Sequence, residues 1–345
     1  MTTFVFPTIA EQIEEPVAHK QAANQLAVDE AVAEVVRAGL ISEPKRLPPW
    51  LFYDAAGSRL FDDITDRPEY YLTRTERGIL AAHADTIVTQ AAEGSRLRIT
   101  ELGAGSADKT RLLLKAAVAQ QGTVVYEPVD VSASALDVAR DRIEREIGGV
   151  SVVPQVMDYT QGNGRGLELM PTEAGERRLV LYIGSSIGNF DPPEAMRLLH
   201  RVRAALRPDD GLLLGVDLVK DEATLLAAYD DVAGVTAEFN LNLLTRLNRD
   251  LGAEFYLESF EHRAVWNQEA SRIEMHLESR IAQKVRLEAL DLELDFAEGE
   301  TIHTENSYKY RPAQIEAMLN EAGFAAVKSL TDERGWFQVC LGRAG

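Results

Sequence analysis

The residues from Arg98 to Thr110 combine a run of apolar side chains, a glycine turn and the start of a helical pattern. Gly103 and Gly105 form the turn, and a residue without a Cβ allows a ligand to lie against the main chain. The pattern is Glu-x-Gly-x-Gly, so Asp108 stands where a dinucleotide fingerprint has its third glycine. The turn therefore predicts a nucleotide-like ligand without a pyrophosphate, although such turns also occur where no ligand binds.

Polar residues also follow the next two predicted strands. Asp130 ends the strand expected at residues 124–130, about 25 residues after the turn, near the spacing of a ribose-binding carboxylate. Asp158 and Tyr159 follow a third apolar run, where an acid and an aromatic ring often meet an adenine base. Because the carboxyl ends of parallel strands share one edge of a sheet, these groups predict S-adenosylmethionine as the ligand. The alternative is that Asp130 only caps the helix that begins near Ser132.

The composition is typical of an ordinary soluble enzyme. The chain has 345 residues, 46% of them hydrophobic, and no apolar run approaches the ~20 residues that span a bilayer. No basic segment followed by an apolar run opens the chain, which predicts a cytoplasmic protein. The net charge of −19 disfavours nucleic acid, and one cysteine (Cys340) with six scattered histidines disfavours a metal site. We expect a monomer that binds a small molecule, with no nucleic-acid or membrane partner.

Strands and helices alternate along much of the chain, which predicts a parallel sheet with helices on both faces. The expected strands of this sheet cover residues 97–102, 124–130, 152–156, 179–183 and 211–217. Helices are expected at residues 24–39, 75–93 and 132–145, with another that begins at residue 109. After residue 217 the expected elements are helices at 223–231 and 235–250 and strands at 255–261, 272–280 and 281–287. The chain then ends with a helix at 312–322 and strands at 327–330 and 335–341.

This order of elements predicts an α/β fold, a Rossmann-like parallel sheet of the class I methyltransferase type with a second, discontinuous α+β domain. We expect a flexible N-terminal segment over residues 1–20. The predicted substrate-binding domain combines residues 21–73 with 218–311. The predicted S-adenosylmethionine-binding domain combines residues 74–217 with 312–345, because the last helix and strands return to the parallel sheet.

Several motifs, in their order and spacing, resemble the histidine-specific Nα-methyltransferases of ergothioneine biosynthesis. The motifs lie at residues 52–62, 67–76, 101–111, 126–132, 183–190, 228–231, 239–244 and 304–307. The resemblance covers nearly the whole chain and is more specific than a single glycine turn. It implies that S-adenosylmethionine donates three methyl groups in succession to the α-amino nitrogen of histidine, which gives the betaine hercynine.

The resemblance also implies which residues hold the methyl donor. Gly103, Lys109 and Asp130 correspond to residues at its methionine and ribose parts. Asp158 and Tyr159 correspond to residues at the adenine.

A second set of implied residues concerns the amino acid. Tyr70, Asn189 and Tyr229 correspond to residues that bind it, with Glu305 and Ser307 at the far end of its side chain. Further wall residues of this site are Gly184, Tyr53, Phe61 and Met275. Asn306 is polar where some members of the family have a small apolar residue, a minor departure beside the side-chain site.

These assignments agree with the chemistry of amine methylation. An in-line displacement requires a neutral nitrogen aimed at the methyl group, and orientation supplies most of the rate gain. Asn189 and Tyr53 are suitable catalytic residues because they form hydrogen bonds without adding a full charge. Glu305 can accept an imidazole N–H and Ser307 can pair with the other ring nitrogen, so side chains without both groups would be rejected.

Three alternatives remain at this point. The same chemistry could act on another free amino acid, such as tryptophan, whose indole offers one N–H to Glu305. A nicotinamide-dependent oxidoreductase is disfavoured by the missing third glycine. A sensor that binds S-adenosylmethionine without catalysis would need no amino-acid pocket beside it.

Overall fold

The computed structural model describes residues 30–105, 107–160 and 167–345. The predicted flexible segment at residues 1–20 and the start of the helix expected at 24–39 lie outside these ranges. The described part of that helix is α2, Glu30–Leu40.

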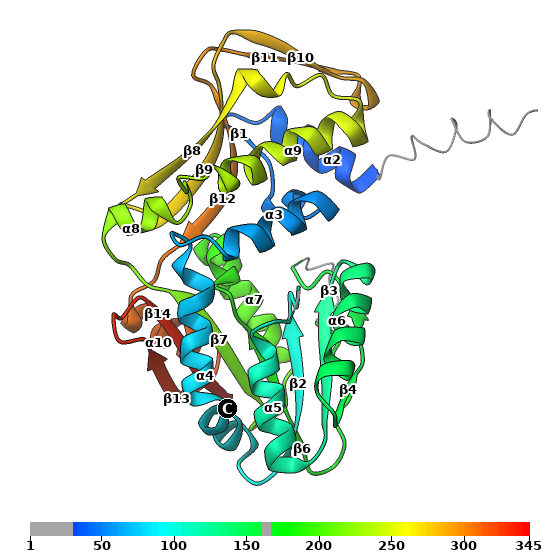
Figure 1. The fold of residues 1–345 in the computed structure, drawn as a ribbon, viewed down its shortest axis with the longest axis vertical. Helices are drawn as coiled ribbons and strands as arrows, with labels where there is room; N and C mark the ends of the chain where they lie inside the picture. Colours follow the sequence, from blue (N-terminus) through cyan, green and yellow to red (C-terminus); the bar gives the residue numbers. More distant parts are fainter. Residues whose placement is uncertain (1–29, 106, 161–166) are drawn as a thin grey trace, which may run out of the picture.

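The described residues form a mixed eight-stranded sheet in the lower part of the molecule (Figure 1). Its strands are β2 (Arg96–Leu102), β3 (Val124–Asp130), β4 (Val150–Val152), β5 (Gln155–Val156), β6 (Glu176–Tyr182), β7 (Gly211–Asp217), β13 (Phe324–Thr331) and β14 (Phe337–Ala344). The order is β13-β14-β7-β6-β2-β3-β4, with β5 also beside β3. Strands β2 to β7 pair in parallel, whereas β14 runs antiparallel to β7 and to β13. The α/β fold with a parallel centre is confirmed.

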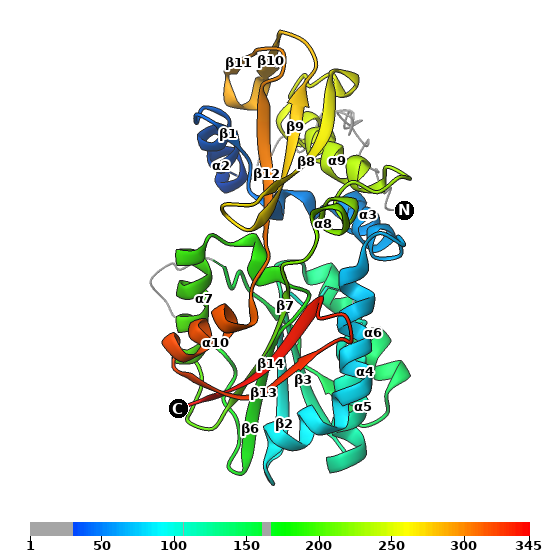
Figure 2. The same ribbon diagram turned by 90° about the vertical axis from the view of Figure 1, so that its left-hand side faces the viewer.

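Helices cover both faces of this sheet (Figure 2). One face carries α4 (Tyr71–Ala92), α5 (Thr110–Gln121) and α6 (Ala133–Glu146), and the other carries α7 (Pro192–Ala204) and α10 (Pro312–Glu321). Successive residues of β6 alternate between the two sides, since Leu179 and Leu181 belong to one core cluster and Val180 and Tyr182 to the other. The continuous apolar strands thus reflect burial on both faces.

A smaller sheet forms the upper part of the molecule (Figure 1). Its order is β1 (Lys45–Arg46), β12 (Thr301–Tyr308), β9 (Arg272–Ser279) and β8 (Phe260–Asn267), and a separate hairpin joins β10 (Gln283–Leu287) to β11 (Leu292–Phe296). The helices of this part are α2, α3 (Ala55–Thr65), α8 (Glu222–Ala227) and α9 (Val235–Leu251). The short 3-10 helices of the described chain are η1 (Pro49–Phe52), η2 (Ser186–Asn189), which follows β6 of the large sheet, η3 (Leu257–Ser259) and η4 (Glu288–Leu290).

Three expectations about the local structure were wrong. The strand expected at 255–261 begins only at Phe260, the first residue of β8, because residues 257–259 form the 3-10 helix η3 and Phe255 packs against Phe260 and Phe296. The strand expected at 152–156 divides into β4 and β5. The helix expected at 223–231 ends at Ala227, because the Asp231 carboxylate accepts backbone N–H groups at the start of α9.

The chain passes between the two parts at three places, namely where α4 begins, after β7 and after β12 (Figure 2). Backbone hydrogen bonds join two of these crossings. Tyr310 N–H donates to the Asp217 carbonyl at 2.9 Å, and Val219 N–H donates to the Tyr310 carbonyl at 3.0 Å. A division into two domains at the boundaries given above stays a prediction.

A buried ion cluster in the large sheet yields a stability prediction. The fully buried Glu127 on β3 accepts hydrogen bonds from Arg98 and Thr100, both at 2.7 Å, and from the buried Arg178. Replacing Glu127 by Ala leaves buried charge without its partner, and we expect the free energy of unfolding to fall by about 3–5 kcal/mol. Urea denaturation followed by circular dichroism measures the change.

The control for this experiment is Asp141→Ala. The Asp141 side chain is 72% exposed in its ion pair with Arg140, so its loss should change the stability by less than about 1 kcal/mol. Equal effects of the two substitutions would contradict the role assigned to Glu127.

Candidate active site

A cavity of about 60 Å³ lies between the carboxyl ends of the parallel strands and the upper sheet. All nine residues expected at the amino-acid site line it, namely Tyr53, Phe61, Tyr70, Gly184, Asn189, Tyr229, Met275, Glu305 and Ser307. They come from α3 and the loops around it, the loop after β6, the turn after α8, β9 and β12. The cavity is small, so a bound amino acid requires movement of the lining side chains, which is common on binding.

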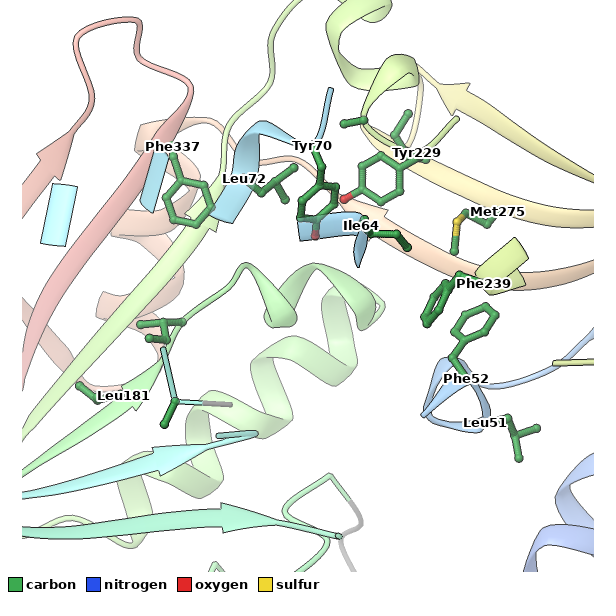
Figure 3. Close-up of a cluster of buried hydrophobic side chains, with 14 of the residues drawn as sticks. Leu51, Phe52, Ile64, Tyr70, Leu72, Leu181, Tyr229, Phe239, Met275 and Phe337 are labelled. Carbon is green, nitrogen blue, oxygen red and sulfur yellow. The ribbon is translucent and has the colours of Figure 1, made fainter. Parts of the chain in front are cut away.

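Aromatic side chains line the cavity, and Figure 3 shows three of them, Tyr70, Tyr229 and Phe239. Tyr70 and Tyr229 lie with ring centroids 6.3 Å apart, and Phe61 lies 6.3 Å from Tyr70 and 5.7 Å from Tyr53. Phe239, which the sequence reasoning did not assign, contacts Tyr53 and Phe61 and lies near Met275 in Figure 3. Tyr53 is 44% exposed and forms the rim. These edge-to-face contacts hold the phenol groups in place.

Glu305 is the charged group of the cavity. Partial burial raises its pKa to about 7, and this rise outweighs the lowering by the Lys309 charge and by a hydrogen bond from Asn189. A carboxyl group in such a site can accept an N–H from a ligand once it is ionised. His303 precedes a register shift in β12, and its ring packs against His276 with centroids 5.0 Å apart. Its Nε2 pairs with the Glu305 backbone carbonyl at 3.0 Å and not with the carboxylate, so the two side chains form no dyad.

A fully buried ion pair lies behind Tyr229 and Ser307. Lys309 Nζ lies 2.9 Å from Asp217 Oδ2, and both side chains are 0% exposed. The same ammonium group donates to Tyr229 Oη and to Ser307 Oγ, each at 2.8 Å, and these two oxygens are 2.7 Å apart. Two hydroxyl groups of the cavity therefore share one buried cation.

Glu76 on α4 connects the cavity to the loop after β2. Its carboxylate accepts the Gly184 N–H at 2.9–3.0 Å and forms an ion pair with Lys109, whose ammonium group lies next to Gly184. Gly215 on β7 is necessary here, because a Cβ at this position would collide with the Glu76 carboxylate. Lys109 is thus held at the boundary between the cavity and the glycine turn.

The glycine turn after β2 is built for close approach of a ligand. Gly103 has φ +70°, and a Cβ added there would lie 2.7 Å from Tyr159 Oη. Asp130 Oδ2 accepts the Gly105 N–H at 3.4 Å. The structure therefore brings Gly103, Tyr159 and Asp130 together at one sheet edge, as expected.

Two carboxylates near this edge of the sheet, Glu101 and Asp158, accept hydrogen bonds from neighbouring residues. Glu101 points into the core, where it accepts from Thr110 at 2.7 Å and from Tyr126, and burial raises its pKa to about 7. Asp158 Oδ1 accepts the Thr160 N–H at 2.9 Å and its hydroxyl at 2.5 Å. Asp158 keeps its predicted place beside Tyr159, with one oxygen engaged in this turn.

The sequence reasoning missed Glu76, Asp217 and Lys309. Glu76 ends one of the quoted motifs, and Asp217 ends the fifth expected strand, as Asp130 ends the second. Lys309 follows Ser307 by two residues, so strand alternation alone could have placed the two side chains on one face.

A second cleft holds none of the site residues expected from the sequence. A more open cleft of about 550 Å³ is lined by four arginines, Arg67, Arg74, Arg77 and Arg334, with neighbouring Thr65, Asp66, Pro68 and Thr73. Within residues 30–105, 107–160 and 167–345, no group of three or more His, Cys, Asp or Glu side chains could hold a metal ion. No helix of these same segments is long and apolar enough to cross a membrane.

Comparison with known proteins gives a match over nearly the whole described chain. A family model described as "Histidine-specific methyltransferase, SAM-dependent" matches residues 32–344. The chain is 46% identical over 322 residues to the histidine N-alpha-methyltransferase of Mycolicibacterium smegmatis, covering 92% of this chain and 98% of that protein. The enzyme of the same name from Mycobacterium tuberculosis is 42% identical with the same coverage. Ergothioneine biosynthesis protein 1 of Neurospora crassa is 31% identical over 84% of this chain and 32% of its own length.

The geometry of Gly103 yields a binding prediction. Replacing Gly103 by Ala places a methyl group against Tyr159 Oη at a backbone angle that L-residues rarely adopt. We expect S-adenosylmethionine affinity to fall at least about tenfold, which corresponds to ~1.4 kcal/mol. Isothermal titration calorimetry measures the affinity.

Gly148→Ala is the matched control, because a Cβ there meets nothing within 4 Å. Equal affinities of the two variants would remove the glycine turn from the ligand site.

The raised pKa of Glu305 yields a second prediction, on stability. Its usual pKa is 4.5 and its folded value is about 7, so the folded state holds this proton more tightly than the unfolded chain. The resulting stabilisation is present below about pH 4.5 and is lost as the pH rises to about 7. We expect Glu305→Gln to be more stable than the wild type by about 2–3 kcal/mol near pH 8.5, with no difference near pH 4.5.

Denaturant titrations at several pH values measure this difference, with the exposed Glu316→Gln as control. A stability difference that does not change with pH would contradict the raised pKa.

Proposed function

Because the chain belongs to the family of histidine-specific, S-adenosylmethionine-dependent methyltransferases, we propose that it methylates the α-amino nitrogen of L-histidine three times. The product is Nα,Nα,Nα-trimethylhistidine (hercynine), and the reaction is the first step of ergothioneine biosynthesis. One observation carries the proposal. Glu305 and Ser307 line the same cavity as Asn189, Tyr70 and Tyr229, so acceptor and donor groups for an imidazole face the groups for an amino acid.

The two ends of the substrate require different partners. Tyr229 and Asn189 can each donate a hydrogen bond to the α-carboxylate. Glu305, once ionised, accepts one imidazole N–H, and Ser307 pairs with the other ring nitrogen. Both ends are then fixed, and the α-amino nitrogen lies between them.

Catalysis by this chain rests on orientation. The residues must hold a neutral amine in line with the reacting methyl group, because effective concentration supplies most of the rate gain. Asn189 and Tyr53 contact the space for the amine without adding a full charge, so they allow the nitrogen to turn for each successive transfer. The aromatic rings of the wall exclude water from the reacting atoms.

The methyl donor fits the edge of the large sheet. Bound S-adenosylmethionine supplies an electrophilic methyl group on its sulfonium. Gly103, Lys109 and Asp130 are the residues proposed to hold its methionine and ribose parts, and Asp158 and Tyr159 its adenine. The fit rests on Gly103, where a side chain would fill the space beside Tyr159, and on Lys109, which lies next to Gly184 of the amino-acid cavity.

Tryptophan is the second candidate substrate. Its indole could donate its one N–H to Glu305 but offers no acceptor to Ser307, whose hydroxyl hydrogen would remain unpaired. This argument favours histidine. A monomeric, cytoplasmic enzyme stays a prediction, and light scattering after gel filtration tests the monomer.

Mass spectrometry tests the proposed function. The purified chain, incubated with S-adenosylmethionine and each free amino acid in turn, should add three methyl groups to histidine. Glu305→Ala should raise the KM for histidine about ten- to a hundredfold, since a hydrogen bond to a charged group contributes roughly 1.5–3 kcal/mol. The KM for S-adenosylmethionine should not change. Trimethylation of another amino acid in preference to histidine would overturn the assignment.

A further inference from the structure

The buried ammonium group of Lys309 is surrounded by protein groups. It forms an ion pair with Asp217 Oδ2 at 2.9 Å and donates hydrogen bonds to Tyr229 Oη and to Ser307 Oγ, each at 2.8 Å. An ammonium group only donates hydrogen bonds. Tyr229 and Ser307 must therefore each use an oxygen lone pair toward Lys309.

We propose that Lys309 is a positioning residue that commits the hydroxyls of Tyr229 and Ser307 to act as hydrogen-bond donors to the substrate. The inference rests on the proposed function and adds a specificity determinant that touches no substrate atom. Lys309 acts through the two hydroxyls, which line the cavity while its own side chain is completely buried.

The hydrogens and lone pairs of the Tyr229 and Ser307 hydroxyls explain this role of Lys309. A hydroxyl can donate one hydrogen bond and accept others, so a Tyr–Ser pair by itself can present either a donor or an acceptor. Here each oxygen uses one of its two lone pairs toward Lys309, and the contact between the oxygens, 2.7 Å apart, uses a third lone pair and one hydroxyl hydrogen. One hydrogen and one lone pair remain for the cavity, and the positive charge of Lys309 favours an acceptor over a second N–H donor at this place. A substrate with two acceptors, a carboxylate and a ring nitrogen, can take both hydrogens by replacing the Tyr229–Ser307 contact.

This arrangement selects one state of the imidazole ring. Glu305 accepts the N–H of one ring nitrogen when its carboxyl group is ionised, and the committed Ser307 hydroxyl donates to the other nitrogen. A ring nitrogen with a lone pair can take this hydrogen, whereas imidazolium would place a second N–H and a positive charge next to the Lys309 ammonium group, so the site favours the neutral ring. Indole is rejected for the lack of an acceptor.

Asp217 and its other partners hold Lys309 in place. Asp217 Oδ2 also accepts the Tyr71 hydroxyl at 2.7 Å, and Asp217 Oδ1 lies 2.6 Å from Lys220 Nζ. Asp217 therefore keeps two partners if Lys309 is replaced, and no buried charge is left alone. This redundancy makes Lys309→Met, which has a side chain of similar length without donors, a suitable test variant.

The test compares Lys309→Met with Lys220→Met. Lys220 contacts Asp217, Tyr71 and the Leu218 carbonyl but neither Tyr229 nor Ser307, so it controls for disturbance of the buried cluster. Lys309→Met should raise the KM for histidine at least about tenfold, with the KM for S-adenosylmethionine unchanged. Lys220→Met should leave both constants within about twofold of the wild type.

A double-mutant cycle separates positioning from structure. If Lys309 acts through the two hydroxyls, Lys309→Met should have no further effect on the KM for histidine in a Tyr229→Phe, Ser307→Ala background, measured well above the pKa of Glu305 so that loss of the Lys309 charge leaves Glu305 ionised. An equal rise in that background, or an equal rise from Lys220→Met, would overturn the proposal. Should Lys309→Met fail to fold, the same cycle with Lys309→Gln, which keeps amide N–H donors, gives the same two outcomes at smaller amplitude.

Calorimetric binding of histidine distinguishes this proposal from the proposed function. Wild-type protein that binds histidine without methylating it would contradict the proposed function alone. Lys309→Met protein that binds histidine with wild-type affinity would contradict the role of Lys309, whatever reaction the enzyme catalyses.

Discussion

The buried ion pair between Asp217 and Lys309 is the interaction on which the arrangement of this molecule depends. Asp217 ends a strand of the large sheet, Lys309 follows the last strand of the small sheet, and Tyr71 opens the helix at the third crossing. The Asp217 carboxylate therefore contacts residues at all three places where the chain passes between its two parts. Removing both charges from water is costly, and only several good hydrogen bonds make such a pair tolerable. Here the same bonds that satisfy Lys309 also orient the hydroxyls of the cavity.

A second constraint is the conflict between stability and recognition at Glu305. A carboxyl group enclosed by aromatic rings prefers its neutral form, and its pKa is about 7. The ionised form is nevertheless the one that the proposed binding of an imidazole N–H requires. Lys309 and Asn189 both lower the pKa of Glu305, so they reduce the cost of ionising it without abolishing that cost. The stability of the protein near neutral pH is lower as a result.

Much of the fold could be predicted from residue patterns. The strands β3 and β7 begin and end at the residues predicted for them, 124–130 and 211–217. Strands that are buried on both faces are continuous apolar runs, and these two end at polar groups. Prediction failed where packing overrode the local pattern. Phe255 looks like a strand residue, yet it lies before β8 and packs against Phe296, far along the chain. The strand that carries Glu305 and Ser307 was not expected as an element, although its partner β9 was.

The sequence by itself determined the α/β class, the glycine turn, the polar strand ends and, through its motifs, nine of the residues that line the cavity. These features depend on local backbone preference and on residue identity, which a sequence states directly. The tertiary structure alone decided that Glu76 joins Lys109 to Gly184, and that Lys309 lies behind Tyr229 and Ser307. Those contacts connect residues up to 108 positions apart, and which hydroxyl accepts and which donates depends on distances that no local pattern contains.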